Sequence, residues 1–285
     1  MAALTVGGHV SSAGGPLKAL ERGQALGFTG IQMHPTAPQS WAKPTVSDET
    51  AAEFKARMNE YGICSAFFHN IYLNNFATPL ESGWHASIAI STAYLTLASK
   101  MGVSGTVTHL GSHKGAGMEI ALPRITEGLK RVLAETPDDS IFTIENTAGA
   151  GGTIGRSLEE IQVIIDSLGD IGNRISVCID TCHAYASGIP IHTLEGFNIF
   201  MAEFEQRLGL QKLACMHMND SKGEFGSNKD RHENIGDGQI GYDGFRHIVN
   251  DPRVASIPLL MEVPGLEEKG PDIANRKRIE ALIVQ

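Results

Sequence analysis

Short apolar runs alternate along the chain with longer stretches of helical pattern. Continuous apolar strands separated by helices are typical of a parallel sheet that is covered on its outer face. The runs lie near Leu4–Val10, Gly30–His34, Ile63–His69, Val103–His109, Ile141–Glu145, Ile175–Asp180, Leu213–Asn219 and Ile257–Val263. The helical patterns include Asp48–Tyr61, Trp84–Met101, Leu158–Leu168 and Asp243–Asn250.

Eight such units in 285 residues average about 36 residues each, which suits a (β/α)₈ TIM barrel of the α/β class. An open doubly wound sheet is the alternative. It is disfavoured because the glycines of Gly7–Gly15 have the wrong order of strand, loop and helix for a dinucleotide-binding pattern. Linkers, low-complexity tracts and charge blocks are absent from the sequence, so we predict a single domain over residues 1–285.

Six consecutive predicted strands end in a residue that can bind a metal ion. One such histidine or glutamate is usually a hydrogen-bonded core residue, but six at one barrel mouth would crowd unpaired buried charges together. Metal cations are the compensation that fits imidazoles and carboxylates together. The six residues are His69, His109, Glu145, Asp180, His217 and Glu262, separated by 40, 36, 35, 37 and 45 positions.

Loops beyond these strands are expected to add His183, Asp230 and His232. Residues two apart in an extended segment point to the same side, so Asp230 and His232 can face one point. The nine candidates are too many for one tetrahedral zinc and suit two or three ions that share carboxylates. The imidazoles favour zinc, while the carboxylates are also compatible with manganese or iron. We expect His9 and His34 to support the ligands as hydrogen-bond donors.

Composition narrows the class of protein further. No apolar run approaches ~18 residues, so no membrane span is expected, and the start lacks the pattern of a secretory signal. We therefore expect a cytoplasmic protein. The formal charge of −9 argues against a broadly basic nucleic-acid binder. The cysteines are expected to be buried free thiols, with no ligand role for Cys178 or Cys182: Cys64, Cys178, Cys182 and Cys215.

Nine segments carry a resemblance that runs nearly end to end. They are Gly8–Gly15, His69–Asn75, His109–His113, Ile144–Gly149, Val177–Ala184, His217–Lys222, Asp230–His232, Gly236–Gly241 and Leu260–Glu262. In this order they resemble endonuclease IV, the zinc-dependent apurinic/apyrimidinic (AP) endonucleases of base-excision DNA repair. The Cys-Ile-Asp-Thr-Cys-His and Asp-Arg-His elements are the most specific part of the match.

The resemblance implies a site with three zinc ions, and all nine ligand positions of the family are present. It assigns His69, His109 and Glu145 to the first ion. It assigns Glu145, Asp180, His217 and Glu262 to the second, and His183, Asp230 and His232 to the third. Glu145 would bridge two ions, and Glu145→Gln or Glu262→Gln is expected to stop catalysis. Three zinc ions would add six positive charges to −9, giving −3, with the whole correction at the barrel mouth.

The implied reaction is hydrolysis of the phosphodiester on the 5′ side of an abasic site in double-stranded DNA, by a DNA-associated monomer. Tyr72 and Leu73 match positions that wedge into the duplex where the damaged nucleotide is extruded. Gln39 occupies the place where some relatives carry an arginine. Lys222, Lys229 and Arg231 are close enough in sequence to contribute to a positive rim.

Two other functions stay open from the sequence. A sugar isomerase or epimerase on the same barrel would use only a Glu, Asp, His, Glu set around one divalent ion, and Glu145, Asp180, His217 and Glu262 match that set. The other five candidate ligands have no place in a one-metal site. A metal-stabilised binding protein without turnover is the third hypothesis.

Overall fold

Eight parallel strands close into a barrel in the computed structural model, which describes residues 4–284. Each strand pairs with its sequence neighbour from β1 to β7, and the last barrel strand, β10, closes the ring between β7 and β1. The predicted (β/α)₈ barrel is therefore confirmed. The barrel strands are β1 (Val6–His9), β2 (Gly30–Met33), β3 (Ser65–His69), β4 (Gly105–Thr108), β5 (Phe142–Glu145), β6 (Ile175–Asp180), β7 (Leu213–His217) and β10 (Leu259–Met261).

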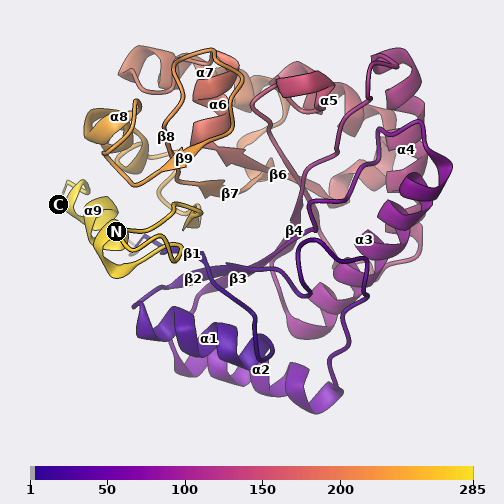
Figure 1. The fold of residues 1–285 in the computed structure, drawn as a ribbon, viewed down its shortest axis with the longest axis horizontal. Helices are drawn as coiled ribbons and strands as arrows, with labels where there is room; N and C mark the ends of the chain where they lie inside the picture. The colour runs from indigo at the N-terminus through magenta and orange to yellow at the C-terminus, as the bar shows by residue number, and fades with distance from the viewer. Residues whose placement is uncertain (1–3, 285) are drawn as a thin grey trace.

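Helices surround the barrel on its outside (Figure 1). Helix α2 shows why they form: Ser47 caps its first turn, and Ala51, Phe54 and Met58 recur at helical spacing to give one buried face. The helices are α1 (Pro16–Ala25), α2 (Asp48–Glu60), α3 (Glu81–Met101), α4 (Met118–Ala134), α5 (Leu158–Ser167), α6 (Thr181–Ser187), α7 (Leu194–Arg207), α8 (Gly241–Val249) and α9 (Ile273–Ala281).

Several apolar runs extend a few residues beyond the strands that they predict. Val10 and Met218 are buried like strand residues, but the paired strands end before them. Apolar character reports burial, and burial continues where the chain turns over the rim of the barrel. Helix α3 begins three residues before the predicted Trp84, because its first turn is polar and carries little apolar signal.

The barrel interior is filled by a layer of small and apolar side chains. Phe67, Val107, Cys178, Cys215 and Leu260 form one buried cluster, each from a different strand. In β3, β4, β6, β7 and β10 the next inward position, two residues further on, lies at the mouth of the barrel. This layer is therefore the floor on which the side chains of the mouth rest.

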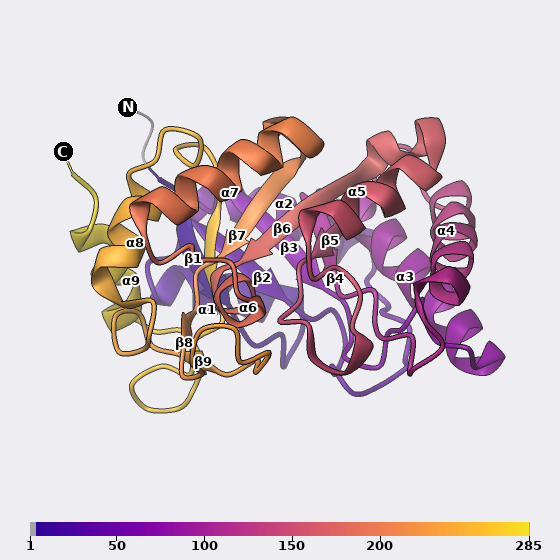
Figure 2. The same ribbon diagram turned by 90° about the horizontal axis from the view of Figure 1, so that it is seen from above.

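A two-stranded antiparallel ribbon extends the mouth beyond β7. Its strands are β8 (Asp220–Ser221) and β9 (His232–Glu233), and they lie with α6 at the same end of the barrel (Figure 2). The buried Asp220 carboxylate accepts backbone N–H groups of Ser221, Gly236, Gly238 and Ile240 at 2.8–3.0 Å. One side chain thus organises the loop between β9 and α8.

Replacing Asp220 with alanine is expected to lower the free energy of unfolding by about 2–4 kcal/mol, because several buried N–H groups lose a charged acceptor together. Urea denaturation of the metal-free protein measures the change. Asp243→Ala is the matched control, since that carboxylate is exposed on α8 and its ion pair in the described part of the chain is with Arg246. Equal midpoints for the two variants would contradict the role assigned to Asp220.

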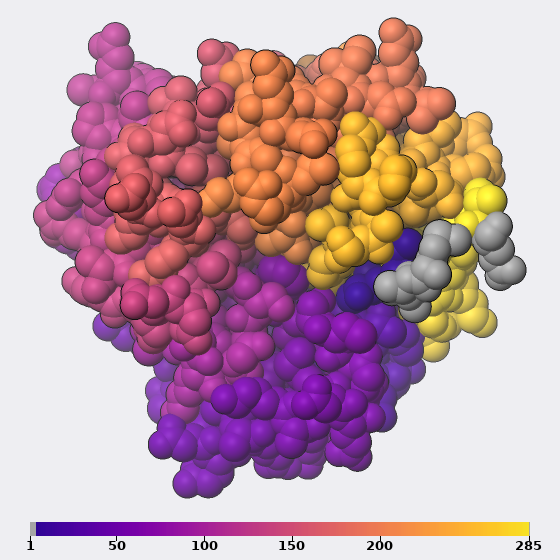
Figure 3. Space-filling model, turned by 180° about the vertical axis from the view of Figure 1, so that it is seen from behind, coloured from indigo at the N-terminus to yellow at the C-terminus, as the bar shows by residue number. Residues whose placement is uncertain are grey.

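The opposite end of the barrel is shown in Figure 3, where the indigo N-terminal segment lies against the yellow C-terminal part. This proximity follows from the pairing of β1 with β10, in which Val6 lies opposite Leu259. Within residues 4–284, none of the helices combines the length and the apolar character that crossing a membrane requires.

Candidate metal centre

The strand ends bring the six predicted side chains together at one mouth. His69, Glu145, Asp180 and His217 are the last residues of their strands. His109 and Glu262 each follow the last paired residue of β4 and β10. Because parallel strands all end at the same side of a barrel, six residues spread over most of the chain meet there.

In the first group, two imidazoles lie next to the same carboxylate oxygen. His69 Nε2 and His109 Nε2 each lie 3.2 Å from Glu145 Oε2. The Glu145 side chain is completely buried. The potential ligand atoms of these three residues all lie within 4.8 Å of one another.

The second group uses the other oxygen of the same glutamate. His217 Nδ1 lies 2.9 Å from Glu145 Oε1, 3.6 Å from Glu262 Oε2 and 3.8 Å from Asp180 Oδ2. These four residues again bring their ligand atoms within 4.8 Å of one another. Glu145 therefore belongs to both groups, with one oxygen facing each.

The third group lies at the rim. Asp230 places Oδ2 3.2 Å from His183 Nε2 and Oδ1 3.2 Å from His232 Nε2. His183 lies in helix α6, so its expected loop position is wrong. The helix starts directly after β6 because Asp180 caps it, with Asp180 Oδ1 accepting the N–H of His183 at 2.8 Å. His183 Nδ1 donates to the carbonyl of Asn146 at 3.0 Å, which leaves Nε2 of the ring toward Asp230.

The imidazoles and carboxylates of the centre shift one another's pKa values toward their charged forms. Burial opposes the charged form of His183, yet the Asp180 and Asp230 carboxylates raise the pKa of His183 to about 10. Burial likewise opposes charge on His232, whose pKa rises to about 9 beside Asp180 and Asp230. Burial opposes ionisation of Glu145, but the nearby His109 and His217 imidazoles hold its pKa well below the ordinary value. Without metal, protonated imidazoles supply the positive charge that the carboxylates need.

The donor set fits cations. Ligands held 2.0–2.1 Å from a tetrahedral zinc lie about 3.3 Å apart, and the shortest N···O separations in the first and third groups are 3.2 Å. His232 Nε2 lies 3.2 Å from Asp230 Oδ1 but makes no aligned hydrogen bond within residues 4–284. A buried nitrogen that faces a carboxylate without an aligned hydrogen bond suits an ion held between the two groups.

Buried amides behind the ligands were missed from the sequence. Asn219 Nδ2 donates to Asp180 Oδ2 at 2.6 Å, while its Oδ1 accepts the N–H of Glu262 at 2.7 Å. Asn146 Oδ1 accepts the N–H of Asp180 at 2.6 Å. The available signal was a polar residue one or two positions after a ligand, at the end of an apolar run.

His9 and His34 both lie beside the candidate ligands, and His34 is a hydrogen-bond donor as expected. His34 Nδ1 donates to the carbonyl of His69 at 2.9 Å, and burial together with the nearby His69 and His9 lowers the pKa of His34 to about 3. His9 Nδ1 lies 3.4 Å from Glu262 Oε1. Both rings therefore pack around the centre without belonging to any of the three groups.

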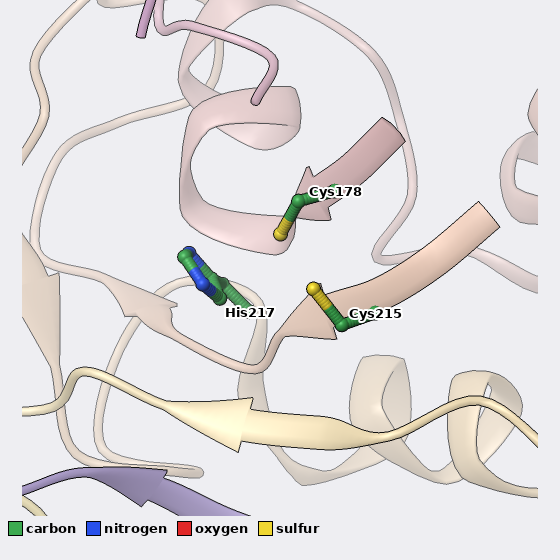
Figure 4. A group of neighbouring side chains, drawn as sticks. All are labelled: Cys178, Cys215 and His217. Carbon is green, nitrogen blue, oxygen red and sulfur yellow. The ribbon is translucent and has the colours of Figure 1, made fainter. Parts of the chain in front are cut away.

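Two thiols lie next to His217 (Figure 4). Cys178 and Cys215 face each other from paired positions of β6 and β7, with their sulfur atoms toward the imidazole. Both nitrogens of His217 are already engaged, by Glu145 and by Gln32, and burial raises the pKa of Cys178 well above its ordinary value. These cysteines act as small apolar side chains of the floor.

The remaining thiols differ from each other. Cys182 is buried beside Asp180 and His232, but burial raises its pKa to about 12, and its thiol donates to the carbonyl of Arg231. All four cysteines are free, as expected. The expected burial of Cys64 is wrong: this residue precedes β3 and is exposed to solvent.

A cavity of about 470 Å³ opens beside the third group. Tyr72 and Leu73 lie on its wall with 67% and 41% of their surface exposed, and so do His109, His183 and Asp230. Tyr72 packs edge-on against His34, with ring centroids 5.4 Å apart. An aromatic and an aliphatic side chain therefore project beside the ligands.

The predicted polar contacts to DNA lie further out. Gln39 is exposed in the loop whose Pro38 carbonyl accepts the N–H of Tyr72. Lys222 is exposed, and its Nζ lies 3.6 Å from Glu233 Oε2. Arg231 Nη1 donates to the carbonyl of Asp230. Neither cation lines the cavity. Lys114, which was missed from the sequence, does.

The fold and the centre define a class: a closed parallel barrel with a cluster of histidine and carboxylate ligands at its mouth. Residues 20–281 match the family described as xylose isomerase-like TIM barrel. A protein of Methanoculleus marisnigri named "Probable endonuclease 4" is 36% identical over 278 residues, covering 97% of this chain and 98% of that protein.

Two of the solved structures that resemble this chain differ in how much they share with it. The endonuclease IV of Thermus thermophilus superposes with a TM-score of 0.84 at 31% identity, covering 98% of each chain. A D-tagatose 3-epimerase-like protein gives a TM-score of 0.70 at 16% identity, covering 98% of this chain and 95% of that one, and shares the fold alone. The chain belongs to the endonuclease IV family.

Proposed function

We propose that this protein is a zinc-dependent AP endonuclease of base-excision DNA repair, working in the cytoplasm as a monomer with one domain over residues 1–285. It hydrolyses the phosphodiester on the 5′ side of an abasic site in double-stranded DNA, leaving a 3′-hydroxyl and a 5′-deoxyribose phosphate. The observation that carries the proposal is the set of three ligand groups, two of them joined through Glu145, beside a cavity with exposed Tyr72 and Leu73.

Zinc ions held by these groups would lower the pKa of bound water to about 7 and stabilise negative charge on the phosphate. Glu145 holds two groups at a fixed separation, because each of its oxygens faces a different set of imidazoles. Asn219 orients the Asp180 carboxylate by donating to it and fixes the backbone of Glu262 by accepting its N–H. No serine or cysteine nucleophile is needed, and burial raises the pKa of the Cys178 and Cys182 thiols.

Substrate recognition rests on the wall and the rim of the cavity. An abasic nucleotide has lost its base pairing and much of its stacking, so extruding it from the duplex is comparatively easy. We assign Tyr72 and Leu73 to the space that it leaves in the stack. Lys114, Lys222 and Arg231 are assigned to phosphates, with Gln39 beside the Tyr72 loop.

A nicking assay on a duplex with one abasic analogue tests the proposal. We expect cleavage 5′ to the lesion, loss of cleavage after treatment with a chelator, and recovery when Zn²⁺ is added back. The same duplex with an intact base is the control. Binding of abasic DNA without cleavage by the zinc-loaded protein would overturn the nuclease and favour a metal-stabilised binding protein.

Tyr72→Ala is expected to weaken binding to abasic DNA about 5- to 100-fold, because one stacked aromatic contributes roughly 1–3 kcal/mol. Fluorescence anisotropy with a non-cleavable abasic duplex measures the effect, and Leu73→Ala is expected to act in the same direction. Leu80→Ala is the matched control, since Leu80 is 68% exposed, like Tyr72, and lies outside the cavity wall. Wild-type affinity in both wedge variants would show that the assignment is wrong.

A further inference from the structure

One strand beside the metal centre contributes none of the nine candidate ligands, yet it sends a completely buried polar side chain into the barrel. This side chain is Gln32 of β2. Its Nε2 lies 2.6 Å from Glu262 Oε1, and its Oε1 lies 2.8 Å from His217 Nε2. Gln32 thus joins two members of the second group that come from β7 and from the residue after β10.

The geometry of the barrel explains how an amide from β2 reaches that far. Strand β1 lies between β2 and β10, with His9 opposite Gln32. The preceding inward residue of β1 is Gly7, which places no side chain beneath the His9 ring. A Cβ atom on Gly7 would collide with the backbone of Gly30, so β1 and β2 are packed closely there. His9 itself makes only longer contacts, 3.2 Å to Gln32 and 3.4 Å to Glu262.

The two partners fix which way the amide points. An ionised carboxylate only accepts hydrogen bonds, so the NH₂ group of Gln32 must face Glu262. The carbonyl oxygen then faces His217 and accepts from Nε2–H. A hydrogen on Nε2 leaves the lone pair of the ring on Nδ1, the nitrogen that faces Glu145, Asp180 and Glu262.

We propose that Gln32 is a positioning residue of the metal centre, which holds His217 in the tautomer that binds metal through Nδ1 and orients the carboxylate of Glu262. This inference rests on the proposed metal centre. Gln32 acts through the two ligands and touches neither the ions nor the DNA. Partners of this kind typically change metal affinity 10- to 100-fold when they are removed.

A purely structural role makes a different prediction. If Gln32 only satisfied buried polar groups, its replacement would lower stability and leave the metal affinity of the folded protein unchanged. Thr143 offers a matched comparison. It is also completely buried inside the barrel, its hydroxyl lies 2.9 Å from that of Ser176, and neither residue belongs to a ligand group.

The experiment measures binding of the metal alone. Zn²⁺ affinity and stoichiometry are determined by competition with a chromophoric chelator in wild type, Gln32→Met and Thr143→Val, and Co²⁺ loading reports the ligand geometry by visible absorption. We expect Gln32→Met to bind one of its ions about 10- to 100-fold more weakly and to change the Co²⁺ spectrum. Thr143→Val is expected to match wild type in both readouts, whatever its melting temperature.

Wild-type affinity and an unchanged Co²⁺ spectrum in Gln32→Met would overturn the inference, as would an equal loss in Thr143→Val. If Gln32→Met does not fold, the Zn²⁺ affinity of Gln32→Glu is measured instead. This variant keeps the acceptor for His217 but loses the donor to Glu262. Weaker binding in that variant supports the inference, and wild-type binding overturns it. If the wild type itself bound no metal, the proposed centre would fail, which is a different result from failure of Gln32 alone.

Discussion

Glu145→Gln is expected to abolish cleavage of abasic DNA while the barrel stays folded. The carboxylate serves two ligand groups, with Oε2 facing His69 and His109 and Oε1 facing His217. An amide of the same shape is neutral and turns one of these acceptors into a donor, so two groups lose a shared charge at once. We expect the rate to fall at least about 10³-fold, which corresponds to about 4 kcal/mol of transition-state stabilisation.

Single-turnover nicking rates at saturating Zn²⁺, together with circular dichroism and metal analysis, measure this effect. Glu262→Gln is expected to act in the same direction. Glu127→Gln is the control, because that carboxylate is exposed on α4 and, among residues 4–284, pairs with Arg131. A metal-loaded Glu145→Gln protein that cleaves at the wild-type rate would show that the bridging carboxylate is not needed.

Most of the fold was predictable because local pattern and global topology agree. Apolar runs of strand length alternate with amphipathic helices, and in a parallel barrel this alternation fixes which ends of the strands meet. His69 and Glu262 are separated by nearly two hundred positions, yet the rule that strand ends share one mouth brings them together. The candidate site was therefore visible as six polar residues that each end an apolar run.

What the sequence did not reveal depends on contacts that no local pattern encodes. Gln32 sits inside an apolar run, and only the closed barrel shows that its amide reaches Glu262 and His217. The loop predicted at His183 is wrong because helix α6 begins directly after β6, with Asp180 as its N-cap. Lys114 carries no motif, and its place on the cavity wall follows from the path of the loop after β4.

Asp230→Asn is expected to remove one metal ion per chain and to leave the other two. Asp230 is half exposed, and within residues 4–284 its carboxylate pairs with the two imidazoles of the third group, His183 and His232. Its loss therefore leaves the carboxylates around His217 and His69 in place. Elemental analysis after gel filtration is expected to give three zinc ions per chain for the wild type and two for this variant.

The number of zinc ions per chain distinguishes the nuclease from a sugar isomerase or epimerase. A sugar isomerase or epimerase would hold one ion with Glu145, Asp180, His217 and Glu262, so its stoichiometry would be one and would not respond to Asp230. Asp237→Asn, in the loop after β9, is the control, because its carboxylate pairs with Arg278 away from the ligands. One ion in both wild type and Asp230→Asn would remove the physical basis for the nuclease, since the third group would then be only an ion pair at the rim.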